Sequence, residues 1–316
     1  MIAKAIAHPN IAFIKYWGKK EHNPKEYSTR NIPLNPSISM TLTRAKTSMS
    51  AQISESDILC FDQQKFTIQN DPKFFNQLNY LKKYFNLPKN ICYQITSQNN
   101  FPHGAGIASS ASAYCALTKL MAKISLGEHG AMKWFKENIS EFSKLSRLGS
   151  GSACRSIGYG FFYWQESYAK PIVSNWKLYN TVLVIDPSRK KTPSSQGHKS
   201  VDNNPLMKQR LSNIQNRIKS TLLAIETKNI KLLGEIIEVE CLEMHKISQA
   251  AGINYLLPKT LEVLDKINSI KNRSFYYTID AGPNIHLISE EPIPRDTLQY
   301  LGSNIEIWSD SNFDNK

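Results

Sequence analysis

The spacing of apolar positions changes between the two halves of this chain. Short apolar runs bounded by turn residues predict strands in the first half, at residues 11–14, 40–47, 48–53, 92–97 and 159–165. Apolar positions at helical spacing predict helices at residues 71–84, 107–125 and 132–148. After a strand at 180–186 the second half is mainly helical, with helices predicted at 205–227, 230–247 and 259–272. Strands return near 275 and 305, and this grouping favours an α+β fold with helices on one side of mainly antiparallel sheets.

A glycine- and serine-rich turn, Asn100–Ser112, opens the predicted helix at 107. Gly104 and Gly106 can adopt backbone angles closed to other residues, so the main chain there can approach a ligand closely. The start of a helix leaves N–H groups unpaired and carries a partial positive charge, which together favour an anion. Ser109 and Ser110 lie on the first turn, where their hydroxyls could reach a phosphate oxygen or Mg²⁺. Taken alone, the stretch fits equally well a loop before a helix that packs closely on a sheet.

A second stretch places a lysine at the end of a buried strand. The apolar run at residues 11–14 leads directly into Lys15, two aromatic residues, a glycine and two more lysines. Desolvating an unpaired ammonium is unfavourable, so a lysine in this position needs an anion. We therefore expect Lys15 to be functional, whereas Lys20 is expected to be a solvated side chain at a basic strand end.

A third stretch alternates glycine and serine after the helix predicted to end at 148. Its alternating residues are Gly149, Ser150, Gly151 and Ser152. The glycines break the helix and bring the serines into a turn rich in hydrogen-bond donors. Arg155 then offers a planar fork that pairs bidentately with carboxylate or phosphate. An ordinary polar connection with a surface arginine is the alternative, but three turns suited to anions in one chain argue against it.

The fourth stretch is a strand that ends in an aspartate. Residues 275–279 are aromatic and β-branched, and Gly282 and Pro283 stop the strand. Asp280 therefore sits on a tight turn, where its carboxylate can point into a cleft or simply cap the turn. His286 lies within an apolar run and is expected to be a core histidine, not a ligand.

These four stretches resemble the motifs of the diphosphomevalonate decarboxylase family of the GHMP kinase superfamily. The family's Asn-Ile-Ala-x-Ile-Lys-Tyr-Trp-Gly-Lys is matched by Asn10–Lys19, and its Asn-Asn-Phe-Pro-x-x-Ala-Gly-Leu-Ala-Ser-Ser-Ala by Asn99–Ala111. The segments Gly-Ser-Gly-Ser-Ala-Cys-Arg-Ser and Asp-Ala-Gly-Pro-Asn correspond to Gly149–Ser156 and Asp280–Asn284. Order and spacing hold from about residue 4 to about residue 290, so the resemblance covers nearly the whole chain.

The resemblance implies two lobes with the active cleft between them. Residues 1–185 would form an N-terminal lobe, similar to a ribosomal-protein fold, that carries the ATP-phosphate loop. Residues 186–316 would form a C-terminal lobe with helices on an antiparallel sheet, carrying Asp280. The implied reaction is the ATP- and Mg²⁺-dependent decarboxylation of mevalonate 5-diphosphate to isopentenyl diphosphate, ADP, phosphate and carbon dioxide, in isoprenoid biosynthesis. A homodimer is also implied.

The resemblance assigns roles to individual residues. Asp280 would accept or orient the proton of the substrate's 3-hydroxyl group, and Lys15 would keep Asp280 ionised and meet the incoming phosphoryl group. Arg155 would clamp the substrate carboxylate and the leaving phosphate. The residues expected to bind substrate are Tyr16, Trp17, Gly18, Lys19, Ser150, Gly151, Ser152, Arg155 and Ser194. The residues expected to bind ATP are Pro102, Gly104, Ala105, Gly106, Ala108, Ser109 and Ser110, with Ser109 or Ser110 directed at the γ-phosphate or its Mg²⁺.

One segment departs from the family pattern Lys-x-Val-Ser-Ser-Thr-x-Gly-Met. Here it reads Lys-Lys-Thr-Pro-Ser-Ser-Gln-Gly-His, ending at His198, and the changed positions are Pro193, Ser195, His198 and, slightly further on, Val201. How the diphosphate is held is therefore open. A phosphomevalonate decarboxylase and a mevalonate-type kinase of the same superfamily remain alternative functions. His103 also stands where a small residue is usual, and we expect it to face solvent.

The amino-acid composition argues against other classes of protein. The 316 residues carry a net charge of +13, but the lysines are spread along the chain and lack a recognisable RNA-binding pattern, which makes a nucleic-acid-binding protein a remote alternative. No apolar run approaches the length of a membrane span, and the start lacks the core of a signal peptide. Five scattered cysteines favour reduced thiols in a cytoplasmic protein, with Cys154 as a packing residue. The polar tail from Ser309 is expected to be disordered.

Overall fold

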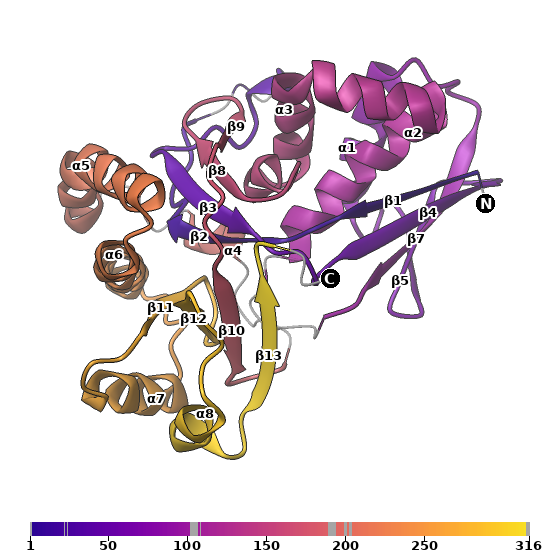
Figure 1. The fold of residues 1–316 in the computed structure, drawn as a ribbon. Helices are drawn as coiled ribbons and strands as arrows, with labels where there is room; N and C mark the ends of the chain where they lie inside the picture. The colour runs from indigo at the N-terminus through magenta and orange to yellow at the C-terminus, as the bar shows by residue number, and fades with distance from the viewer. Residues whose placement is uncertain are drawn as a thin grey trace.

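The computed structural model describes residues 2–313 except 22, 24, 102–106, 108, 189–193, 199–200 and 202–203. Two lobes lie side by side, with the N-terminal sheet and its helices at one end and the C-terminal sheet at the other (Figure 1). A third sheet, formed by N-terminal segments, lies between them and faces two long helices of the second half. The predicted α+β architecture with mainly antiparallel sheets is confirmed.

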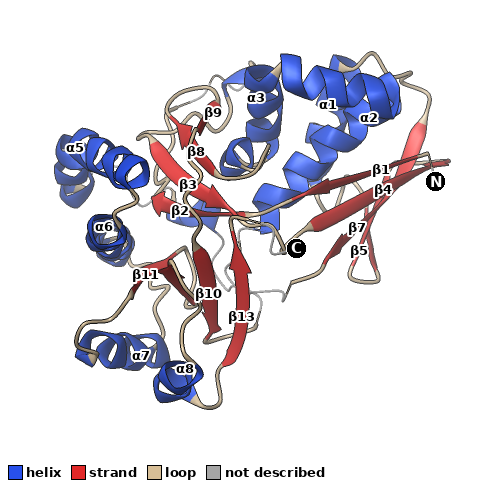
Figure 2. Ribbon diagram, viewed as in Figure 1, coloured by secondary structure: helices blue, strands red, loops and turns tan. Residues whose placement is uncertain are grey.

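The N-terminal lobe is built on a five-stranded sheet of order β1–β4–β7–β5–β6. Its strands are β1 (Ala3–Ala7), β4 (Thr47–Ser54), β5 (Ile58–Phe61), β6 (Gln64–Phe66) and β7 (Cys92–Asn99). All neighbours are antiparallel except the parallel pair β5 and β7. The helices α1 (Pro72–Tyr84), α2 (Ser109–Glu137) and α3 (Ile139–Gly149) lie on one side of this sheet (Figure 2).

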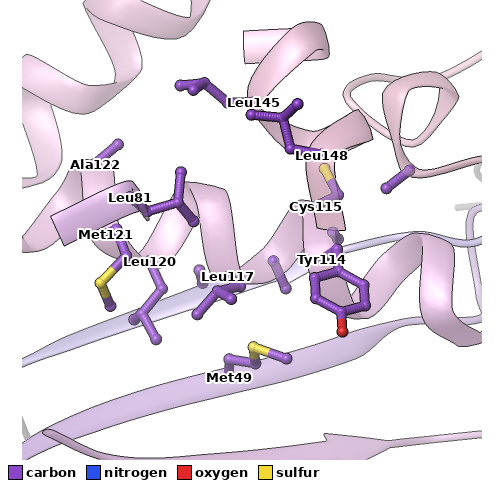
Figure 3. Packing of buried hydrophobic residues seen from close by; sticks show 14 of the residues in the cluster. Met49, Leu81, Tyr114, Cys115, Leu117, Leu120, Met121, Ala122, Leu145 and Leu148 are labelled. Carbon is purple, nitrogen blue, oxygen red and sulfur yellow. The ribbon is translucent and has the colours of Figure 1, made fainter. Parts of the chain in front are cut away.

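The core of this lobe forms where α2 faces the sheet. Figure 3 shows Leu117, Leu120 and Met121 of α2 above Met49 of β4, all of them buried. Leu145 and Leu148 of α3 join the same cluster. Burying a side chain of this size stabilises the fold by roughly 1.5–3 kcal/mol, so this layer fixes the start of α2 against the sheet.

The middle sheet has the order β2–β3–β8–β9. Its strands are β2 (Asn10–Ile14), β3 (Ser37–Thr41), β8 (Phe161–Trp164) and β9 (Ala169–Ile172). In the chain, the short helix η1 (Tyr27–Thr29) lies between β2 and β3, and the short helix η2 (Gly151–Arg155) precedes β8. Apolar residues of this sheet share one buried cluster with α5 (Pro205–Thr227) and α6 (Ile230–Ala250), so the two halves of the chain are packed together at β2.

The C-terminal lobe has a fully antiparallel sheet of order β11–β12–β10–β13. Its elements are β10 (Tyr179–Val184), α4 (Ser194–Gly197), α7 (Pro258–Ser269), β11 (Phe275–Ile279), β12 (Ile285–Ser289), α8 (Arg295–Gly302) and β13 (Glu306–Ser311). Because β10 pairs with β12 and β13, we propose that this lobe begins at Tyr179, a few residues before the expected boundary at 185.

Two predicted elements are wrong in their extent. The strand predicted at 40–47 is the end of β3, which stops at Thr41, followed by a turn and the start of β4. The helix predicted at 132–148 is divided at Asn138, whose backbone angles of φ −122° and ψ 41° are not helical. The helix predicted at 107–125 is the first part of α2, up to a kink at Gly127, where φ is +70° and ψ is 171°.

The polar C-terminal tail is ordered through Phe313, contrary to the prediction of disorder from Ser309. The carboxylate of Asp310 accepts hydrogen bonds from the backbone N–H groups of Thr43, Arg44 and Ala45, at 3.1, 2.9 and 2.7 Å. Its side chain caps the turn between β3 and β4, so strand β13 ties the C-terminal sheet to the N-terminal half.

Candidate active site

The centre of the candidate site is an ion pair between the two lobes. The Nζ atom of Lys15, directly after β2, lies 2.6 Å from Oδ1 of Asp280, directly after β11. Lys15 is 2% exposed and the Asp280 side chain 22%, so only the carboxylate reaches solvent. Lys15 Nζ also donates to the carbonyl of Ala12 at 2.9 Å. The ammonium expected to need an anion therefore has one, and that anion is the predicted aspartate.

A buried network of charges holds the backbone of Lys15. Its N–H group donates to Oε1 of Glu240 on α6 at 3.0 Å, and its carbonyl accepts from Arg210 on α5 at 2.9 Å. Arg210 also pairs with Glu240 and donates to Asn35, whose amide in turn donates to the Lys15 carbonyl at 2.9 Å. Burial alone would raise the pKa of the Glu240 carboxyl, but Arg210 and Arg217 hold it below its ordinary value. Helices of the second half thus fix a strand end of the first.

Arg155 at the end of η2 is buried beside the same strand. Its Nε donates to Oδ1 of Asn10 at 3.3 Å and its Nη1 to the hydroxyl of Ser37. The guanidinium carbon lies 5.6 Å from the centre of the Trp164 ring, a cation–π arrangement. Burial lowers the pKa of Arg155, while the negative charge of Asp280 acts in the opposite direction. An arginine guanidinium stays charged at neutral pH. The negative charge of Asp280 therefore interacts with the positive charge of Arg155.

An aromatic pair and a histidine form the wall next to Lys15. The His198 ring lies between Tyr16 and Trp17, with ring centres 4.3 and 5.0 Å away. Its Nδ1 accepts a hydrogen bond from the N–H of Gly18 at 3.0 Å, so the Nε2 atom carries the proton of the neutral ring. Burial and the charges of nearby cations lower the pKa of His198 to about 3. At the position where the family has a methionine, this chain therefore has a neutral hydrogen-bond acceptor beside Gly18.

Two glycines let segments approach this wall closely. A Cβ atom at Gly151 would lie 2.5 Å from Cε1 of Tyr16, and one at Gly197 would lie 2.5 Å from the Trp17 ring. Gly18 has a φ of +80°, which other residues rarely adopt, and Val201 packs against it. The altered segment that contains His198 and Val201 thus packs directly on Tyr16–Gly18.

Three cations gather beyond Gly18. Lys19 Nζ donates to Oδ1 of Asn31 at 2.7 Å. Desolvation of its ammonium, followed by repulsion from Lys73 and Arg30, lowers the pKa of Lys19 to about 8. Desolvation and Arg30 likewise lower the pKa of Lys73. Lys19 and Lys73, whose pKa values are lowered by desolvation and by neighbouring cations, form with Arg30 a site that a polyanion would stabilise.

The serines of the two predicted turns meet. Ser110 Oγ lies 3.2 Å from Ser150 Oγ, which lies 3.5 Å from Ser152 Oγ. Ser109 and Ser110, at the start of α2, and Ser194, at the start of α4, are exposed. Five predicted ATP-binding residues lie outside the described part of the chain: Pro102, Gly104, Ala105, Gly106 and Ala108. Among the positions that depart from the family pattern, His103, Pro193 and the side chain of Ser195 also lie outside it.

The residues interpreted as structural are buried away from any reactive role. His286 is fully buried on β12, as predicted. Cys154 is fully buried in the core of the N-terminal lobe, as expected of a packing residue, and burial raises the pKa of its thiol to about 12. Among residues that the structure describes, no cluster of three His, Cys, Asp or Glu side chains could hold a metal ion. In the same described part, no helix is long and apolar enough to cross a bilayer.

Sequence reasoning missed the residues that act from a distance. Arg210 and Glu240 lie within regular helices, and Lys73 lies near the start of α1. Charged residues at such positions usually face solvent, so no signal in the sequence distinguishes them. Asn10 precedes the apolar run of β2 and was the one available signal, because a fully buried polar residue needs partners.

Comparison with known proteins identifies the fold. Residues 7–171 match the model of the diphosphomevalonate decarboxylase-like N-terminal domain, and residues 180–314 match that of the mevalonate 5-diphosphate decarboxylase C-terminal domain. The chain belongs to the diphosphomevalonate decarboxylase family. Among relatives in this family, the diphosphomevalonate decarboxylase of Candida albicans is 31% identical over 95% of this chain and 87% of its own length.

Solved structures of diphosphomevalonate decarboxylases have the same fold. The mevalonate diphosphate decarboxylase of Staphylococcus aureus superimposes with a TM-score of 0.83 at 30% identity, covering 97% of this chain and 94% of that one. A structure described as a complex with MVAPP, AMPPCP and magnesium also gives a TM-score of 0.83, at 29% identity, covering 97% of this chain and 95% of that one. The two-lobed architecture expected from the resemblance is therefore confirmed for this member of the diphosphomevalonate decarboxylase family.

Proposed function

We propose that this chain catalyses the ATP-dependent decarboxylation of mevalonate 5-diphosphate, giving isopentenyl diphosphate, ADP, phosphate and carbon dioxide. Membership of the diphosphomevalonate decarboxylase family supports the reaction. The observation that carries the proposal is the contact of 2.6 Å between Lys15 and Asp280, which joins the two lobes. It supplies a carboxylate for the substrate hydroxyl and a cation for the phosphoryl group at one place.

Asp280 receives or orients the proton of the 3-hydroxyl as that oxygen attacks the γ-phosphorus of ATP. Lys15 favours the ionised form of the carboxylate and faces the charge that is transferred. Once the tertiary carbon carries phosphate, loss of that phosphate leaves positive charge on the carbon, and the bond to the carboxylate carbon breaks to supply electrons for the double bond. The balance is one phosphate and one carbon dioxide for each ATP.

The cations around the pair divide the remaining negative charge. Arg155, whose fork suits carboxylate or phosphate, lies close enough to Asp280 for the two charges to interact, and it binds the substrate carboxylate. The cluster of Lys19, Lys73 and Arg30 takes the diphosphate, because a dianionic group relieves the mutual repulsion of the three cations. Tyr16 and Trp17 face the apolar carbons.

ATP fits the start of α2, where Ser109 and Ser110 present exposed hydroxyls and Ser110 meets Ser150. Oxygen atoms are the ligands that Mg²⁺ prefers, so the hydroxyl of Ser109 or Ser110 would hold the Mg²⁺ of the nucleotide. When bound, Mg²⁺ neutralises charge on the transferring phosphoryl group. The N-terminus of the long helix α2 adds its partial positive charge.

The deciding experiment compares carbon dioxide release from mevalonate 5-diphosphate and mevalonate 5-phosphate in the presence of ATP and Mg²⁺. We expect carbon dioxide release from mevalonate 5-diphosphate. The cluster of Lys19, Lys73 and Arg30 has more positive charge than a single phosphate would require. Release mainly from the monophosphate would make the chain a phosphomevalonate decarboxylase. ADP without carbon dioxide would make it a kinase, and nucleic-acid binding without ATP turnover would overturn the assignment altogether.

Two further features belong to this proposal. All five cysteines are free thiols, which supports a reducing, cytoplasmic setting. We also propose a homodimer, which sedimentation at several protein concentrations would test. A single species with the mass of one chain, 35.9 kDa, at all concentrations would exclude the dimer.

A further inference from the structure

A cavity of about 570 Å³ opens on the N-terminal lobe, and no residue that lines it is among those assigned to catalysis or substrate binding. It lies between β1, the middle of α2 and residues 156–159. Pockets of 300–1,000 Å³ are the usual size for small-molecule ligands. The feature is thus large enough for a ligand of its own.

Two lysines of α2 are held at this cavity by the edge strand of the sheet. Lys119 Nζ donates to the carbonyl of Ile6 and Lys123 Nζ to the carbonyl of Lys4, each at 3.1 Å. An ammonium has three donors, so each lysine keeps donors for a further acceptor. Lys123 also pairs with Glu128 at 2.7 Å, and Lys4 is a third lysine of the lining. With three lysines and one carboxylate, the lining carries net positive charge.

Apolar side chains, some of them open to solvent, form another part of the lining. Met132 is 48% exposed, Ile6 37% and Tyr159 65%, and Phe135 and Phe142 stand beside them. Single exposed apolar residues are ordinary, but several that converge on one cavity beside fixed cations form an amphipathic site.

An extended peptide does not fit this place. A peptide that adds to a sheet edge needs the free backbone groups of the edge strand. In β1 the carbonyls of Lys4 and Ile6 already accept from the two lysines, which blocks the edge as lysines commonly do. The occupant must therefore use the ammonium groups themselves and the apolar side chains.

We propose that this cavity is a second binding site, which takes an amphipathic anion. Its phosphate or carboxylate head binds Lys119 and Lys123, and its apolar body lies against Met132 and Phe135. Binding in this cavity does not depend on the function proposed above, whereas its coupling to a substrate on Arg155 rests on that function.

The far wall of the cavity is connected to the active site. Ser156 lines the cavity, and its hydroxyl accepts from Asn10 at 2.8 Å. Asn10 in turn accepts from Nε of Arg155 at 3.3 Å. A ligand in the cavity and a substrate on Arg155 therefore share this hydrogen-bond chain. Coupling of this kind changes the affinity to a plateau, whereas direct competition raises the apparent Kd in proportion to the competitor.

The probe is n-octyl phosphate, titrated by calorimetry into the full chain below its micelle-forming concentration. Octanol and inorganic phosphate are the matched probes that lack the head or the body, and octanoate compares a carboxylate head with a phosphate head. We expect octyl phosphate or octanoate to bind at least tenfold more tightly than octanol and inorganic phosphate. Binding of neither amphiphile, or equal binding of inorganic phosphate, would overturn the proposal.

Variants locate the binding. Lys119→Met removes a head-group donor and Met132→Glu places a carboxylate in the cavity at an exposed position, so each should weaken binding about tenfold or more. Lys133→Met removes a charge from an exposed residue of the same helix outside the lining and should leave binding unchanged. An apparent Kd that rises in proportion to mevalonate 5-diphosphate, or that is the same in all variants, would place the ligand elsewhere and refute the site.

Discussion

The backbone N–H of Lys15 donates to the carboxylate of Glu240, 225 positions further along the chain, at 3.0 Å. Glu240 is fully buried, and ion pairs with Arg210 and Arg217 hold its carboxylate in place. The carboxylate therefore fixes the end of β2 and does not move with it. The position of the Lys15 ammonium relative to Asp280 is therefore set by α5 and α6, which hold the backbone of Lys15.

Glu240→Gln should lower both stability and kcat. The substitution keeps the shape but leaves Arg210 buried without its full counter-charge, which costs about 3 kcal/mol of unfolding free energy. Displacement of Lys15 should then reduce kcat by about tenfold to a hundredfold with a smaller change in KM. Urea unfolding and steady-state carbon dioxide release measure the two effects.

The matched control is Asp57→Asn. Asp57 also pairs with a lysine, Lys82 at 3.1 Å, and accepts a backbone N–H, from Tyr93 at 2.8 Å, but it lies directly before β5 of the five-stranded sheet. The Asp57→Asn variant should be less stable than the unmodified chain but keep its kcat. If both variants lowered kcat equally, Glu240 would have only a general structural role.

Asp280→Asn should abolish turnover and leave affinity for substrate and ATP within a few-fold. The change removes the proton acceptor and the partner of Lys15 with little change in volume, and general-base groups contribute roughly 10²–10⁴ in rate. Single-turnover ADP formation and calorimetric Kd values provide the test. Weakened binding with an unchanged rate for bound substrate would mean that Asp280 only shapes the turn.

The activity on the diphosphate substrate should decline in alkali because of Lys19. Its pKa of about 8 lies below the ordinary lysine value, so the free enzyme carries this charge below pH 8 and loses it above. We expect kcat/KM to fall by about tenfold per pH unit above that point, since kcat/KM reports groups of the free enzyme.

Lys19→Arg tests this directly, because an arginine keeps its charge in this range. The alkaline decline should disappear or move well upward in this variant. Lys20→Arg, at the exposed neighbouring position, should keep the profile of the unmodified chain. An identical decline in Lys19→Arg would assign it to another group.

His198 should make stability depend on pH on the acidic side. Its folded pKa of about 3 lies below the value of 6.5 for a free side chain, so the unfolded chain binds the extra proton between these values. Stability is therefore fully present above pH 6.5 and is lost as the pH falls toward 3. Between pH 7 and pH 5 this single group should cost about 2 kcal/mol of unfolding free energy.

Urea unfolding at pH 7 and pH 5 can isolate the contribution of His198. His198→Gln keeps an acceptor for the Gly18 N–H without titrating, so its loss between the two pH values should be smaller by about 2 kcal/mol. His129→Gln, at an exposed position on α2, should behave like the unmodified chain. A pH dependence that is the same in all three proteins would rule out the protonation of His198 as its cause.

Local signals were sufficient for some elements of the fold. Helix α5 begins and ends where predicted, because Asn204 caps its first turn, Pro205 follows, and Lys228 leaves the helix with a φ of +51°. The strand predicted at 275–279 is β11, and Asp280 follows it on a tight turn as predicted, with the Gly282 N–H bonded to the Asp280 carbonyl. Each of these signals is contained within a few neighbouring residues.

Other features depend on contacts that no local pattern records. Glu240 and Arg210 look like ordinary charged positions of a solvated helix until α5 and α6 pack on β2. The polar residues after 308 suggested disorder, yet Asp310 is polar because it caps a turn more than 260 residues away. The sequence identified both serine-rich turns as candidate anion sites, and Ser110 of one turn contacts Ser150 of the other. The contact between them depends on the fold and has no local signal in the sequence.

The carboxylates of Asp310 and Glu240 also fasten the two halves of the molecule to each other at separate points. Hinge motion requires that contacts on one side give way while the other side turns. Here both fastenings are buried, with Asp310 2% and Glu240 0% exposed, and opening either one would strand a carboxylate away from its donors. We therefore expect the two halves to stay joined at these two points while the enzyme turns over.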